Sequence, residues 1–199
     1  MRKAACDYLD IQPSELRLGV RAITRNQEPP TFEVYLVDAL ENGAGYCQYL
    51  AAENRMLTEV LLPLRDGQLA AASILREDHV NGCDASCPDC LREFGNSEYH
   101  PLLDWRLAFD LLNLAINADT EINLSGRYWQ GLAVSATQQF ASLVGGQVSS
   151  SDRLDLGFAG KVLTVTHPLL ASSRNDANCI NLFELIRRPG KVITEIGGG

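Results

Sequence analysis

The chain has 199 residues and a formal net charge of −8, with 46% hydrophobic and 21% charged residues. This composition is typical of a globular protein with one good core or two small lobes. The acidic balance argues against a free-standing, non-specific nucleic-acid binder, which would normally be basic. Since no apolar run approaches the length of a membrane span, we expect a soluble, cytoplasmic protein.

The N-terminal part of the sequence predicts a short helix followed by a β-hairpin. Residues 1–12 are helix-like and end at Pro13. Residues 16–22 alternate apolar and polar side chains, which is the period of a half-buried strand. Residues 32–38 are rich in β-branched and aromatic side chains and predict the second strand. The polar turn at 26–30 contains two prolines, so we expect a longer loop than a tight turn.

A glycine-rich loop connects the second strand to the next helix. Asn42, Gly43 and Gly45 allow the backbone to adopt positive φ and to approach another group closely. Such a loop can be a tight connection packed against a neighbouring element. It can also contact a phosphate or the backbone of a partner with its amides. The spacing and the lysine of a phosphate-binding P-loop are absent.

Three helices are predicted in the middle of the chain. The first spans 46–62 and is limited by Pro63, and the second spans 67–78 and ends next to His79. The third, 101–117, is so apolar that we expect most of its circumference to be buried.

The start of this third helix carries the clearest local signals. Pro101 suits the first turn of a helix, and Asp104 there complements the helix dipole. Arg106 and Asp110 lie four residues apart, and we interpret them as an ion pair on the solvent-exposed edge.

Three cysteines between the second and third helices form the strongest chemical signal in the sequence. Cys83, Cys87 and Cys90 have the spacing C-x3-C-x2-C, and a Cys-x-x-Cys turn can direct two thiolates at one tetrahedral ion. Structural zinc is our main interpretation, and a redox pair, an iron–sulfur cluster or free thiols remain alternatives. A disulfide framework is disfavoured because no signal peptide opens the chain. The fourth ligand is missing from the run, and the candidates are His79, with His100 and Cys47 as alternatives.

The C-terminal part predicts a helix followed by strands. A helix over 128–144 ends at two glycines. The later elements are expected as strands at 154–158 and 161–166, a polar loop at 171–178, a short helix or strand at 181–188 and a final strand at 191–196.

This helix-and-strand order resembles the skeleton of restriction-type nucleases. In these nucleases, an acidic residue and a Glu-x-Lys sequence on the next strand are needed to hold Mg²⁺. Asp155 is available, but the next strand has no such pair, so the resemblance implies an inactive site. An unrecognised metal-dependent nuclease that uses Asp155 with Glu184 or Glu195 is the alternative function.

We therefore expect a mixed α/β (α+β) fold of two parts. Residues 1–118 would form the hairpin and the helical zinc-binding region. Residues 119–199 would form a C-terminal α/β region packed on the first as one unit.

Three blocks together resemble the MrfA-type zinc-binding (MZB) domain, which occurs C-terminal to DEAD/DEAH-box helicases of DNA repair and phage defence and in DrmB-type subunits of the DISARM system. The resemblance covers residues 30–117. The blocks are Asp38-x3-Asn42-Gly43-Ala44-Gly45-Tyr46-Cys47, Cys83-Asp84-x-Ser86-Cys87-x-Asp89-Cys90-Leu91-Arg92 and His100-x-Leu102-Leu103-Asp104-Trp105-Arg106-Leu107.

The resemblance implies a Zn²⁺ site, although the ligand pattern departs from that of the family. The helicases use four cysteines, whereas Asn81 and Gly82 stand here where the first cysteine would be, and His79 is the nearest substitute. The chain contains no Walker A sequence and no DExH-type box, so these residues cannot hydrolyse ATP. The resemblance therefore implies a non-catalytic accessory module that docks to a DEAD/DEAH-box helicase, or to the helicase domain of the same polypeptide, and meets DNA through that complex.

Any direct contact with nucleic acid would depend on two small basic groups. The first is Arg17, Arg21 and Arg25, and the second is Arg187, Arg188 and Lys191. A purely structural interaction protein without nucleic acid is the third hypothesis.

Overall fold

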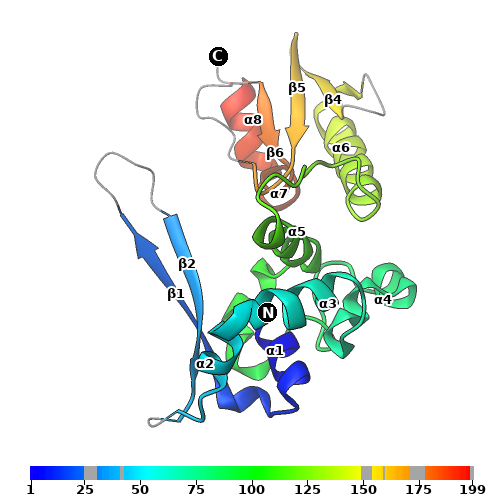
Figure 1. The fold of residues 1–199 in the computed structure, drawn as a ribbon. Coiled ribbons are helices and arrows are strands. Elements are labelled where there is room, and N and C mark those ends of the chain that lie inside the picture. Colours follow the sequence, from blue (N-terminus) through cyan, green and yellow to red (C-terminus); the bar gives the residue numbers. More distant parts are fainter. Residues whose placement is uncertain (25–30, 41–42, 149–153, 159, 171–177, 198–199) are drawn as a thin grey trace. The chain divides into compact units, whose positions relative to one another are not determined.

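The computed structural model describes the whole chain except residues 25–30, 41–42, 149–153, 159, 171–177 and 198–199. It divides into two compact units, Met1–Ala118 and Asp119–Gly199. The predicted mixed α/β class is confirmed, with a two-stranded sheet in the first unit and a four-stranded sheet in the second (Figure 1). None of the described helices combines the length and apolar character needed to cross a membrane.

The first unit consists of a hairpin and short helical segments. The predicted hairpin is confirmed as β1 (Leu16–Ile23) paired antiparallel with β2 (Thr31–Asp38), and it projects from the helices of its unit (Figure 1). The predicted turn at 26–30 lies outside the described residues. The α-helices are α1 (Arg2–Leu9), α2 (Tyr46–Ala51), α3 (Leu62–Arg65), α4 (Glu77–Gly82) and α5 (Trp105–Ile116). The 3-10 helices are η1 (Pro13–Glu15), η2 (Ala52–Asn54), η4 (Ala70–Leu75) and η5 (Phe94–Leu102), and η3 (Met56–Leu61) is a π-helix.

Helix α1 lies at the centre of the hydrophobic core of this unit. Its residues Ala4, Ala5 and Cys6 are buried, and their small side chains let the helix approach η3 and η4 closely. Two polar contacts also tie α1 to a distant part of the chain. Lys3 Nζ donates to the carbonyl of Asp89 (2.8 Å), and Arg2 forms an ion pair with Glu93.

The helix expected over 46–62 is wrong as a single element. Glu53 and Asn54 adopt left-handed φ values of 54° and 57°, which no continuous helix allows, so α2 ends at Ala51. Pro63 does not end a helix but lies at the start of α3, which directly continues η3. The helix expected over 67–78 is likewise divided between η4 and α4.

The helix expected over 101–117 begins later than its proline indicated. Pro101 lies inside η5, and Asp104 precedes α5 as its N-cap. Only Trp105 and Arg106 of α5 are buried, so the expectation of a helix buried on most of its circumference is wrong.

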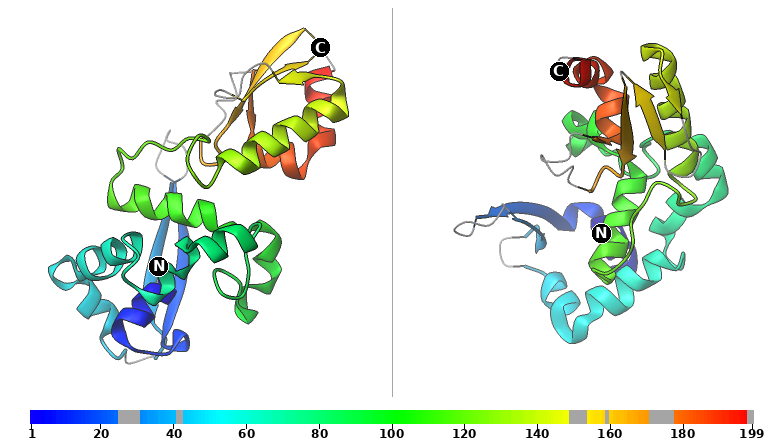
Figure 2. Two further views of the ribbon diagram at one scale, coloured as in Figure 1. Left: turned by 90° about the vertical axis from the view of Figure 1, so that its right-hand side faces the viewer. Right: turned by 90° about the horizontal axis from the view of Figure 1, so that it is seen from above.

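The second unit places helices beside its sheet (Figure 2). The predicted helix 128–144 is confirmed as α6 (Gln130–Val144), and it packs against strands β3 and β4 and helix α7. The sheet has the order β3-β4-β5-β6, in which only the β5–β6 pair is parallel. Its strands are β3 (Gln147–Val148), β4 (Asp155–Phe158), β5 (Lys161–Thr166) and β6 (Cys179–Asn181).

The end of the chain is helical, and the expected final strand at 191–196 is wrong. Helix α7 (Leu182–Arg187) begins after Asn181, whose side chain accepts a hydrogen bond from the Phe183 N–H (2.9 Å). Helix α8 (Pro189–Gly197) then packs against α7 and buries Val192. The β-branched residues of this segment favour a strand, but Pro189 starts a helix and tertiary packing outweighs their propensity.

Candidate metal centre

Four donor side chains converge at the end of α4 and in the loop that follows. His79 lies in α4, Cys83 directly follows this helix, and Cys87 and Cys90 lie in the next turn. One ring nitrogen of His79 and the three Sγ atoms all lie within 4.8 Å of one another. Within the part of the chain that the structure describes, this is the one group of three or more His, Cys, Asp or Glu donors. We call residues 79–92 the metal loop.

The imidazole of His79 is held with one nitrogen facing the thiols. Its Nδ1 lies 3.0 Å from the carbonyl of Ile74, so Nδ1 carries the proton and donates. Its Nε2, which is then the free lone pair, lies 3.5 Å from Cys87 Sγ. Metal-binding histidines commonly donate their other ring N–H to a backbone carbonyl in this way, which fixes the tautomer and the orientation of the ring.

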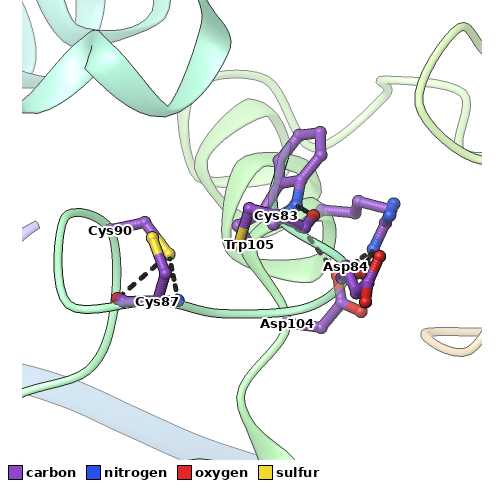
Figure 3. Close-up of polar contacts among 7 residues, drawn as sticks. Cys83, Asp84, Cys87, Cys90, Asp104 and Trp105 are labelled. Atoms are coloured by element: carbon purple, nitrogen blue, oxygen red, sulfur yellow. Dashed lines mark hydrogen bonds and ion pairs between the residues drawn. The ribbon is translucent and has the colours of Figure 1, made fainter. Parts of the chain in front are cut away.

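The two last cysteines sit in a tight turn (Figure 3). The Cys87 N–H donates to Cys90 Sγ (3.0 Å), so a backbone dipole already points at this sulfur. The carbonyl of Cys87 accepts the N–H groups of Cys90, Leu91 and Arg92 at 3.2, 3.2 and 3.0 Å. These bonds close the turn and hold Cys87 and Cys90 near each other.

Burial and the neighbouring thiols perturb the pKa values of all three cysteines. Burial raises the pKa of Cys83 to about 12, and the neighbouring Cys90 and Cys87 act in the same direction. Burial also raises the pKa of Cys90. At Cys87 burial again opposes ionisation, but hydrogen bonds from Cys90 and from the Asp89 and Cys90 amides outweigh it and lower the pKa. Three thiolates this close cannot coexist without a positive charge between them.

Residues at the start of α5 hold the metal loop in place by donating hydrogen bonds to carbonyl groups of the loop (Figure 3). The Trp105 indole N–H donates to the carbonyl of Cys83 (3.1 Å), and the Trp105 backbone N–H donates to that of Ala85 (2.8 Å). The same indole ring contacts the His79 imidazole edge-on, with centroids 5.6 Å apart. Trp105 is fully buried and contacts two of the four donor residues, Cys83 and His79.

Arg106 extends this anchor, and the expectation that it lies on an exposed edge is wrong. Its side chain is buried and donates to the carbonyl of Asp84 (2.6 Å). It also pairs with the buried Asp104, with Nη1 and Oδ2 3.2 Å apart. Burial raises the pKa of Asp104, although the Arg106 guanidinium and nearby amides oppose that shift. The guanidinium is thus used to hold the metal loop rather than to contact solvent.

The structure does not bring the two other candidate ligands to the cluster. Nε2 of His100 lies 2.9 Å from Asn96 Oδ1 and 3.1 Å from the carbonyl of Glu93, within its own turn. Cys47 belongs to the hydrophobic core around α1, and burial together with Asp38 raises its pKa to about 11. Of the six candidate ligands, the structure brings together His79, Cys83, Cys87 and Cys90.

The loop before α2, residues 38–47, is closed by a carboxylate to which the sequence pattern assigned no role. Asp38 accepts the N–H groups of Gly45 and Cys47, both at 3.0 Å. Gly43 and Gly45 have positive φ values of 58° and 82°, and Asn42 lies outside the described residues. Because Asp38 occupies the Gly45 and Cys47 amides, packing explains this loop better than contact between these amides and a phosphate. We call residues 38–47 the glycine loop.

The acidic residues of the alternative nuclease site do not form a cluster. Asp155 accepts a hydrogen bond from the Thr164 hydroxyl (2.7 Å), and Glu184 pairs with Lys191 (3.3 Å). Neither belongs to a group of three or more metal donors within the described residues. The side chain of Glu195 lies outside them.

Comparison with known proteins gives one similarity. Over 109 residues, 54% of this chain, the sequence is 31% identical to Druantia protein DruE of Escherichia coli strain UMEA 4076-1. The matched region is only 5% of the length of DruE, so the chain corresponds to a small part of that protein. No protein-family profile and no solved structure matches the chain.

Proposed function

We propose that this chain is a zinc-stabilised, non-catalytic module that supports a DNA helicase in a phage-defence or DNA-repair complex. The observation that carries the proposal is the convergence of His79, Cys83, Cys87 and Cys90 within 4.8 Å. The similarity to Druantia protein DruE supports a defence system as the context.

The donor set favours zinc. Three thiolates and one imidazole form a Cys3His set, which is typical of structural zinc sites. Zn–S and Zn–N bonds of about 2.3 and 2.05 Å at tetrahedral angles separate sulfur from nitrogen by about 3.6 Å. The observed separation of Cys87 Sγ and His79 Nε2 is 3.5 Å. Four protein ligands leave no open position for a substrate, so the site would stabilise the fold rather than catalyse a reaction.

The helicase partner is proposed from the resemblance to MZB domains, in which this module accompanies DEAD/DEAH-box helicases. The whole of DruE is about twenty times longer than the matched region, so such a module would act beside much larger machinery. A cytoplasmic location is part of this proposal, since three cysteines that bind zinc must stay reduced.

Elemental analysis of the purified chain tests the metal. We expect about one zinc per chain, and a His79→Asn variant should lose it while a His100→Asn variant keeps it. Iron in place of zinc, or a folded chain that never held metal, would overturn the metal assignment.

Co-elution tests the partner. The chain is mixed with the helicase encoded beside it, or with the helicase domain of its own polypeptide, and both complex formation and DNA-stimulated ATPase activity are measured. We expect a stable complex and no ATPase or nuclease activity from this chain alone. Metal-dependent DNA cleavage that disappears in an Asp155→Ala variant would favour the nuclease instead.

A further inference from the structure

The two faces of the β1–β2 hairpin differ in chemistry. Residues directly opposite in an antiparallel pair share a face, and successive residues alternate between faces. One face is apolar and includes the exposed Val20 and its partner Val34. The other face, which we call the arginine face, comprises Arg17, Gly19 and Arg21 of β1 and their partners Val37, Tyr35 and Glu33 of β2.

The ring of Tyr35 lies across the backbone of Gly19 at the middle of the arginine face. A Cβ atom at Gly19 would collide with this ring and would lie 2.6 Å from the phenol oxygen. The glycine therefore lets the ring lie against the sheet, an arrangement that also stabilises a strand glycine. Tyr35 nevertheless remains 42% exposed, so part of the ring is open to solvent.

Two arginines flank this ring. Arg17 and Arg21 lie two residues before and after Gly19, so they are about 13 Å apart with Tyr35 between them. Arg17 is exposed and forms no ion pair within the residues that the structure describes. Arg21 is 67% exposed and pairs with Glu33 (Nε–Oε2, 2.6 Å). The face carries two positive charges and one negative charge on a chain that is otherwise acidic.

We propose that the arginine face binds single-stranded DNA, with a base stacked on Tyr35 and phosphates contacted by Arg17 and Arg21. An aromatic ring between cationic side chains is the combination that binds single strands, because every base offers a face for stacking and every nucleotide a phosphate. A paired base is already stacked in its duplex, so the ring favours unpaired strands. The choice of DNA over RNA rests on the function proposed above.

The same residues set the strength of this binding. Glu33 neutralises Arg21 and repels phosphate, and the net charge of −8 opposes long-range attraction. Binding by the isolated chain is therefore weak and depends on salt. A helicase that already holds the strand would supply it at high local concentration.

Fluorescence anisotropy with labelled dT12 at low salt tests the site. Tyr35→Leu should weaken binding roughly 5- to 150-fold, the loss expected for one stacked base, while Tyr35→Phe keeps most of it. Arg17→Gln should weaken binding and reduce the salt slope by about 0.7. Arg188→Gln lies in the second basic group and tests that competing surface, and it should bind as the parent protein does. Arg127→Gln, at an exposed arginine outside both groups, is the matched control.

Glu33→Gln separates binding from folding, because a damaged hairpin cannot bind more tightly. We expect this variant to bind dT12 more tightly and with a steeper salt slope. The proposal is wrong if Arg17→Gln and Tyr35→Leu bind like the parent chain, if Glu33→Gln brings no gain, or if Arg188→Gln causes the larger loss.

Two further probes distinguish the nucleic acid. Tighter binding of rU12 or of a DNA duplex than of dT12 would overturn the assignment to single-stranded DNA. Zinc content and helicase co-elution, measured on the same preparations, report separately on the proposed function. If the chain binds zinc and the helicase but does not bind dT12, the DNA site is wrong and the proposed function is unaffected.

Discussion

The metal loop and the glycine loop differ in the groups that hold their backbone in one conformation. Both are irregular segments whose backbone must be held in one conformation. In the glycine loop, the Asp38 carboxylate accepts two amides and completes the structure with the chain's own groups. In the metal loop, three thiols and an imidazole converge with no cationic side chain among the four donors. The described contacts of the first loop come from the chain itself, whereas the four donors of the second could hold a metal ion.

The largest expected effect comes from removing one thiol of the metal loop. Cys87→Ser or Cys90→Ser should abolish zinc binding and the cooperative unfolding of the first unit, since structural zinc contributes roughly 10–16 kcal/mol of apparent binding free energy in small domains. Thermal melts with and without a chelator measure this. Cys6→Ser and Cys179→Ser are the controls, and equal losses at all four positions would contradict a metal site.

A smaller effect is expected at Trp105, which supports the metal loop without binding metal. Trp105→Phe removes the donor to the buried carbonyl of Cys83 and should cost about 1–3 kcal/mol. We also expect zinc to be released faster to a chromogenic chelator. Trp129→Phe, in the second unit, is the control and should leave the zinc release rate unchanged. Equal release rates for both variants would show that the anchor does not affect the metal.

Adding side chains to the glycine loop should cost about 1–3 kcal/mol at each position, because both glycines have positive φ. Gly43→Val should lower the free energy of unfolding more than Gly45→Val does. A Cβ atom at Gly43 would lie 3.0 Å from Asp38 Oδ2, whereas no atom lies within 4 Å of one at Gly45. Urea unfolding of both variants measures the difference. Unchanged midpoints would mean that the loop tolerates a side chain.

The smallest effect is expected from the carboxylate itself. Asp38→Ala leaves the two amides at the start of α2 to water and should cost about 1 kcal/mol, the usual loss of a helix cap. Zinc content should not change, which sharpens the contrast between the loops. Loss of zinc in this variant would show that the two loops are coupled after all.

The sequence predicted the local chemistry better than the long-range contacts. Cysteine spacing is local, so the convergence of Cys83, Cys87 and Cys90 with His79 could be expected from their positions along the chain. The roles of Asp38 and Trp105 could not, because each depends on contacts between separate elements. Both residues belong to the blocks that resemble MZB domains, and this was the one signal that could have drawn attention to them.

Secondary structure was predicted well where periodicity was strong and poorly where packing decides. Alternation in β1 together with the β-branched and aromatic residues of β2 identified the hairpin, and two glycines marked the end of α6. Left-handed φ values at Glu53 and Asn54 break the predicted helix. Asparagine adopts this conformation more readily than most residues, but one Asn is too weak a signal to place a break. In α8, β-branched residues pointed to a strand, whereas Pro189 at its start, the contact with α7 and the burial of Val192 explain the helix.

The contacts of α1 determine when the first unit can fold during synthesis. The helix packs on η3 and η4, and Lys3 and Arg2 also meet the Asp89 carbonyl and Glu93, so the last of its partners appears only after about ninety further residues have been made. An eight-residue helix is not stable alone in water. At roughly 5–20 residues per second, α1 would wait on the order of 5–18 s on the ribosome before it docks. This unit therefore folds late and as a whole, rather than from its N-terminus onward.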